Sequence, residues 1–99
     1  MKTVYILFYS NSLGTREEVR DYLDSLSEVL HWRYDLTNVF YLISSENADT
    51  LAKLIHQFSP KGRFLITEFS KQNNQGWLPK ETWEFLNEKV YSDDYIYEK

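Results

Sequence analysis

The chain begins with an apolar run that predicts a buried β-strand. In "VYILFY" (residues 4–9) the odd-numbered and the even-numbered positions are both apolar, so both faces of this strand should be covered. The polar segment "SNSLG" then ends the strand. Thr15 and Glu18 have the spacing of a capping box, and apolar side chains follow at helical spacing, which predicts an amphipathic helix of about four turns. These side chains are Val19, Tyr22, Leu23, Leu26 and Leu30.

The rest of the chain alternates between strand-like and helix-like patterns. "VLHWRY" (29–34) and "VFYLIS" (39–44) predict a hairpin that turns at "DLTN". A second amphipathic helix is predicted over residues 48–58, after N-cap candidates in "SSEN" and before the stop signal "SPKG". "RFLITEF" predicts a fourth strand, and Pro79 suits the first position of a third helix.

The element order β-α-β-β-α-β, with an added C-terminal helix, predicts an α+β fold: a ferredoxin-like sandwich with an antiparallel sheet. We expect a single domain over residues 1–99, with a core at 2–69 and a C-terminal helix and tail at 77–99. The first and third strands are expected to be central neighbours that run parallel. Their ends would then bring the segments 10–14 and 44–47 together.

Two helices can cover only one face of such a sheet. The opposite face is expected to carry much of an aromatic and aliphatic set, namely Tyr5, Leu7, Tyr9, Trp32, Tyr34, Phe40 and Leu42. An apolar face of this size needs a cover. We predict a second copy of the chain, which gives a homodimer joined through the sheet faces, with the C-terminal helix carrying Trp77 and Trp83 as the other candidate.

Composition restricts the function classes. Hydrophobic residues make up 42% and aromatic residues 17% of the 99 residues, which indicates a packed core. The net charge of −4 argues against tight non-specific nucleic-acid binding, which needs surplus Lys and Arg. The absence of cysteine rules out disulfides and thiolate metal sites. The apolar runs are too short to cross a bilayer, so we expect no membrane partner and a cytoplasmic location.

Hydroxyl and amide side chains are expected to meet where the first strand ends. This candidate pocket contains Tyr9, Ser10, Asn11, Ser12, Ser44 and Asn47. Helix N-termini starting at the same end could hold an anion there, because their free N–H groups carry a partial positive charge. The structural interpretation, which we favour, is that these residues are helix caps and turn residues.

Two further groups of residues have a chemical and a structural interpretation. Trp32, Arg33, Tyr34 and Arg63 could form a nucleic-acid face in which the rings stack on bases and the arginines bind phosphate. The favoured alternative is that the rings pack internally and the arginines pair with nearby acids. His31 and His56 have no partner at metal-ligand spacing, so we expect structural or surface roles, and no cofactor is expected.

The residues that carry a family resemblance are "YILFYSNSLG", "HWRYDLTNVFYLIS", "RFLITEF" and "GWLPKETWEFLNE". Over residues 2–88 the chain resembles the small ferredoxin-like CRISPR-associated nucleases and integration adaptors, and most closely their stand-alone bacterial relatives. The resemblance implies a homodimer in which a first-strand aspartate from each subunit binds a metal. Ser10 stands at that position here, and a neutral hydroxyl is a poor ligand for a hard cation.

The leading hypothesis is therefore a non-catalytic homodimeric interaction or regulatory module with a protein or nucleic-acid partner. The alternative is a ribonuclease or deoxyribonuclease that uses Mg²⁺ or Mn²⁺ with displaced ligands, namely Glu68 or Asp93 and Asp94. A third hypothesis is an acidic decoy that binds a nucleic-acid-handling protein through its charge.

Overall fold

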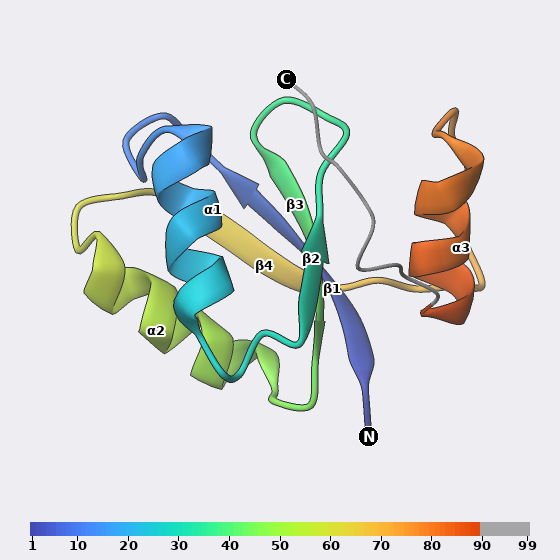
Figure 1. Cartoon of the computed structure of the whole chain (residues 1–99), viewed down its shortest axis with the longest axis horizontal. Coiled ribbons are helices and arrows are strands. Elements are labelled where there is room, and N and C mark those ends of the chain that lie inside the picture. Colours follow the sequence, from blue (N-terminus) through green and yellow to red (C-terminus); the bar gives the residue numbers. More distant parts are fainter. Residues whose placement is uncertain (90–99) are drawn as a thin grey trace.

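The computed structural model describes residues 1–89 and shows a four-stranded antiparallel sheet with three helices. The elements follow the predicted order and agree with a ferredoxin-like sandwich (Figure 1). Their bounds are β1 (Thr3–Tyr9), α1 (Arg16–Ser25), β2 (His31–Arg33), β3 (Val39–Ser44), α2 (Ala48–Phe58), β4 (Phe64–Glu68) and α3 (Lys80–Glu88). The predicted tail after the third helix, at 90–99, lies outside the described residues.

The strands lie in the order β2-β3-β1-β4, so β1 and β3 are the central pair, as predicted. The prediction that they run parallel was wrong. They are antiparallel, with Thr3 opposite Ser44 and Phe8 opposite Val39. The physical reason is that β3 returns from β2 through a short hairpin and must therefore run opposite to it. The end of β1 consequently lies beside the start of β3.

Helices α1 and α2 cover one face of the sheet, and this face holds the larger core (Figure 1). The aromatic and aliphatic set that was expected on the uncovered face points into this core instead. Tyr5, Leu7, Tyr9, Phe40 and Leu42 are buried there, and Tyr34 and Trp32 pack with them. The prediction failed because both faces of β1 and β3 are apolar, so alternation alone could not tell which set faces the helices.

Helix α3 packs on the opposite face of the sheet (Figure 1). It buries Phe85 and Leu86 against Val4, Tyr41 and Ile43, which are the alternate residues of the two central strands. Part of the cover that we assigned to a second copy is therefore supplied by the chain's own third helix. The remainder of this face is open, as described below.

Local signals set most of the element bounds. The capping box is present, because Glu18 N–H donates to Thr15 Oγ1 at 3.1 Å and Thr15 N–H donates to Glu18 Oε1 at 2.9 Å. Asn47 caps α2 by accepting from Thr50 N–H at 2.8 Å. Helix α1 ends at Ser25, earlier than the apolar spacing predicted, and its C-cap residue Leu26 already has extended dihedral angles. The chain needs the residues after Ser25 to reach the edge of the sheet.

Gly62, in the loop before β4, lies against Leu13. A Cβ atom at Gly62 would stand 2.7 Å from Leu13 Cα, a backbone atom that cannot easily move. We expect Gly62→Ala to lower the free energy of unfolding by about 1–3 kcal/mol, as overpacking does in other cores. Gly76→Ala is the control, because no atom of residues 1–89 lies within 4 Å of the place that its added methyl group would take. Urea denaturation of both variants checks this, and equal stabilities would contradict it.

Candidate functional site

The serines at the end of β1 form a hydrogen-bonded turn. Ser10 Oγ lies 2.5 Å from Ser12 Oγ, and the backbone N–H of Arg63 donates to Ser12 Oγ at 3.1 Å. The backbone N–H of Ser10 donates to Arg63 O at 3.0 Å, and Asn38 Nδ2 donates to Asn11 Oδ1 at 3.0 Å. These contacts tie the turn to the loops that precede β3 and β4, which agrees with the structural interpretation of these residues.

The other half of the expected pocket lies at the opposite end of the sheet. Ser44 pairs with Thr3, at the start of β1, so it is roughly 20 Å along the strand from Ser10. Ser44 Oγ donates to Glu28 O at 2.6 Å, and Asn47 caps α2. Tyr9 is buried in the core under α1 and α2. The six candidate residues therefore do not form one pocket, because β1 and β3 are antiparallel.

The expected nucleic-acid face is also divided. Trp32 and Tyr34 stack on each other on the helix-covered face, with ring centroids 6.2 Å apart, and Arg16 lies 4.5 Å over the Tyr34 ring. Trp32 Nε1 donates to Asp24 Oδ1 at 2.9 Å. Arg63 is exposed and precedes β4, at the other edge of the sheet. Both rings therefore pack with the larger core, as the favoured alternative expected.

Arg33 points to the opposite face, where it is buried in a polar cluster with Asp35 and Thr82 of α3. Arg33 Nε donates to Thr82 Oγ1 at 2.5 Å, and its Nη2 lies 3.5 Å from Asp35 Oδ1. The Thr82 hydroxyl donates to Asp35 Oδ2. This contact with Asp35 confirms the favoured alternative, in which Arg33 pairs with a nearby acid. The cluster fastens α3 to β2.

The acidic residues considered as metal ligands are dispersed. Glu68 is exposed at the end of β4, and Asp93 and Asp94 lie outside the described residues. Within residues 1–89, no group of three or more His, Asp or Glu side chains is placed to hold a metal ion. His56 lies in the last turn of α2, near the C-terminal end of the helix dipole.

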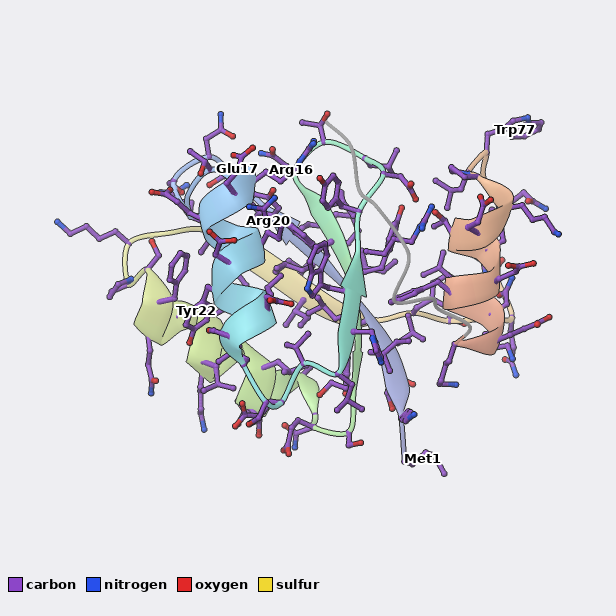
Figure 2. All side chains as sticks on the ribbon, in the orientation of Figure 1. Met1, Arg16, Glu17, Arg20, Tyr22 and Trp77 are labelled. Carbon is purple, nitrogen blue, oxygen red and sulfur yellow. The ribbon has the colours of Figure 1, made fainter. Side chains whose placement is uncertain are left out.

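Sequence reasoning missed the apolar surface that α3 leaves uncovered. We call it the open face and define it as Phe8, Leu36, Leu65 and Trp77, which are 43%, 47%, 61% and 94% exposed. Phe8 and Leu65 are cross-strand partners on β1 and β4. Trp77 projects from the loop before α3 (Figure 2). The sequence indicated this surface through the even-numbered apolar positions of β1, which we had expected to face the helices.

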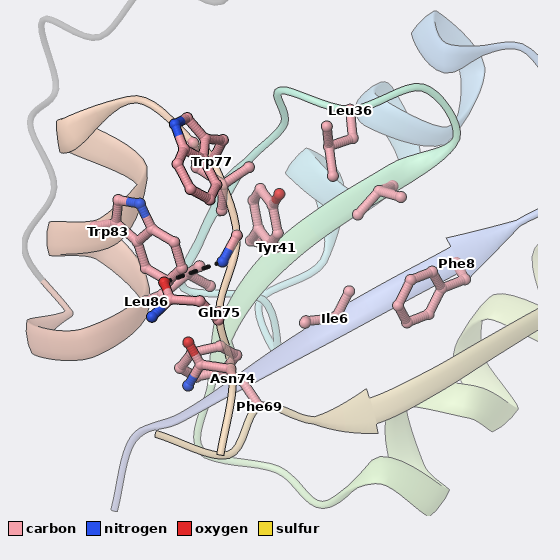
Figure 3. Close-up of a pocket in the computed structure, with 13 residues that line it drawn as sticks. Ile6, Phe8, Leu36, Tyr41, Phe69, Asn74, Gln75, Trp77, Trp83 and Leu86 are labelled. Carbon is pink, nitrogen blue, oxygen red and sulfur yellow. Dashed lines mark hydrogen bonds between the residues drawn. The ribbon is translucent and has the colours of Figure 1, made fainter. Parts of the chain in front are cut away.

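A pocket lies next to the open face, between α3 and the sheet (Figure 3). Its volume is about 300 Å³, and its floor includes Tyr41 of β3. The Tyr41 side chain is buried, and its hydroxyl has no hydrogen-bond partner among residues 1–89. Burial raises the pKa of Tyr41 to about 12, with a smaller contribution from the Asp35 carboxylate and partial opposition from Arg33. The hydroxyl is therefore protonated at neutral pH.

Among the helices formed by residues 1–89, none has the length and apolar character that crossing a membrane requires. Comparisons of the chain with models of protein families, with curated proteins and with solved structures found no match.

Proposed function

We propose that the chain is a homodimeric interaction or regulatory module of the cytoplasm, without a catalytic step of its own, that pairs through the open face. The single observation that carries the proposal is the exposure of Phe8, Leu65, Leu36 and Trp77 on one side of the sheet. Apolar patches of this kind on small proteins commonly mark interaction sites. The kinship with small CRISPR-associated proteins belongs to the same proposal and is supported by the β-α-β-β-α-β order.

A second copy fits this face better than a nucleic acid does. The four side chains are uncharged, so two copies related by a two-fold axis meet without charge repulsion. A nucleic acid needs several cations, and Arg33 is already paired with Asp35. The exposed Arg63 lines a hollow together with Phe8 and is one cation beside the open face. The net charge of −4 also disfavours a polyanion.

The exposed area sets the expected affinity. The four side chains offer on the order of 500 Å² per chain, against about 800 Å² per partner in a standard interface. Flanking residues must therefore join the contact, and we expect a dimer that dissociates in the micromolar range.

The test is the association state of a matched pair of variants. Leu65→Glu places a charge within the proposed contact, where apolar side chains would surround it, and should weaken dimerisation at least tenfold, measured by sedimentation equilibrium or light scattering. Leu30→Glu makes the same change at a site that is 39% exposed elsewhere on the surface, and should leave dimerisation unchanged. A wild-type chain that stays monomeric at high concentration, or equal effects of the two variants, would contradict the proposal.

A further inference from the structure

The pocket beside α3 is built entirely from one chain. Its aromatic walls are Trp77 and Trp83, and its apolar floor runs from Ile6 of β1 to Tyr41 of β3 (Figure 3). Asn74 and Gln75, from the loop that leads to α3, add two side-chain amides. The backbone N–H of Gly76 donates to Gln75 Oε1 at 3.2 Å, which orders this loop locally.

The hydroxyl of Tyr41 distinguishes this pocket from an ordinary gap in packing. A buried hydroxyl without a partner costs stability, and the large majority of buried polar groups in proteins are hydrogen-bonded. Thr82, which is buried on the same face, follows that rule by donating to Asp35. Among residues 1–89, Tyr41 has no such acceptor. A ligand with an acceptor atom would supply the missing hydrogen-bond partner of this hydroxyl.

The position of this hydroxyl fits a ligand that enters from the open side of the pocket. In Figure 3 the hydroxyl end of the Tyr41 ring is directed toward Leu36. Leu36 belongs to the loop between β2 and β3 and is exposed, so its side chain can move aside. Once a ligand covers this end, the hydrogen bond would form away from water, where it is stronger.

The lining defines the chemical class of the ligand. Within the described part of the chain, no charged side chain lines the pocket, so an ionised group would lose its hydration without gaining a partner. Indole and phenyl walls favour a flat ring, and about 300 Å³ is at the small end of ligand sites. We propose that this pocket binds a small, uncharged, planar aromatic molecule that carries a hydrogen-bond acceptor. The Tyr41 hydroxyl donates to this acceptor.

The inference goes beyond the proposed dimer, because all the lining residues belong to one copy. Phe8, Leu36 and Trp77 are shared between the pocket and the open face, so a second copy would close the mouth of the pocket. Leu65 is outside the pocket lining. The Leu65→Glu variant therefore separates the two proposals.

The experiment uses two probes of similar size, one with a hydrogen-bond acceptor and one without. 2-Acetylnaphthalene carries a carbonyl, and 2-ethylnaphthalene has nearly the same shape without it. Each is titrated into the full chain, and binding is followed by backbone and indole N–H chemical shifts. We expect shifts at Tyr41, Trp77 and Trp83, and about fivefold to tenfold tighter binding of the acetyl compound.

Two hydroxyl deletions provide the matched variants. Tyr41→Phe should reduce the preference for the acetyl compound to about one while the ethyl compound still binds. Tyr22→Phe removes a hydroxyl that donates to Leu54 O on the other face, and should keep the preference. At protein concentrations at which the wild type is monomeric, Leu65→Glu should bind both probes as the wild type does.

Three outcomes would overturn the inference. The first is the absence of shifts at Trp77, Trp83 and Tyr41 with either probe. The second is a preference for the acetyl compound that survives Tyr41→Phe, which would place the acceptor elsewhere. The third is loss of binding in Leu65→Glu, which would show that the site needs two copies. A monomeric wild type that still binds with the expected preference would contradict only the dimer.

Discussion

Asp35→Ala is expected to lower the free energy of unfolding by about 3–5 kcal/mol, because it removes a carboxylate that pairs with the buried guanidinium of Arg33. The side chains of Arg33 and Asp35 are only 7% and 14% exposed, so water cannot replace the lost carboxylate. The hydroxyl of Thr82 loses its acceptor in the same variant. Urea denaturation followed by circular dichroism measures the loss. The contacts that hold α3 on the sheet should weaken with it.

The control for Asp35 is an ion pair on the surface. Asp49 Oδ2 lies 2.9 Å from Lys53 Nζ, and both side chains are more than two-thirds exposed. Asp49→Ala should therefore cost less than about 1 kcal/mol. The double variant Arg33→Met with Asp35→Leu should recover much of the loss, because the apolar residues replace both buried charges together. If Asp35→Ala were as stable as Asp49→Ala, the polar cluster would not be what fastens α3.

Phe40→Ala is the second large effect, with an expected loss of about 3–5 kcal/mol. Phe40 is fully buried on β3 and its ring centroid lies 5.4–6.0 Å from those of Tyr9, Trp32 and Tyr34. Removing the ring leaves a cavity at the centre of the larger core that rigid neighbours cannot fill. In a domain with about 5–15 kcal/mol of total stability, this variant is close to unfolding.

Phe8→Ala is the matched control, since it makes the same truncation on the adjacent central strand. The Phe8 ring is on the open face, and we expect its removal to cost the monomer about 1 kcal/mol or less. Thermal melts should show a lower midpoint by more than about 10 °C for Phe40→Ala and by a few degrees for Phe8→Ala. Comparable shifts would mean that Phe8 is covered in solution, which dimerisation through the open face would explain.

The order and type of the elements could be predicted because local signals agreed with each other. Thr15 with Glu18 marked one helix start, Asn47 lay within the predicted cap of the next, and the bounds of β3 match the predicted strand. Pro79 was expected as the first helical residue and is the N-cap of α3. Each of these features depends on a few neighbouring residues, so it can be read without knowing the rest of the fold.

The site could not be predicted in the same way, because it depends on which distant residues meet. The expected pocket combined Ser10 with Ser44, and the antiparallel register separates them. The polar cluster joins Arg33 and Asp35 to Thr82, which is more than forty residues away in the sequence. Nothing local to Thr82 signals that contact. Tyr41 read as an ordinary strand residue, and only the tertiary structure shows that its hydroxyl is buried without a partner among residues 1–89.

The position of β1 in the middle of the sheet has a consequence for how the chain folds during synthesis on the ribosome. Strand β1 pairs on both sides with strands that follow it in the sequence, β3 and β4. It therefore lacks one of its two neighbouring strands until Phe64–Glu68 has been translated. During that interval its apolar side chains stay accessible to chaperones. Chaperone capture on nascent chains should accordingly detect β1 as a binding target until β4 has been made. The chaperone should be released when β4 pairs with β1.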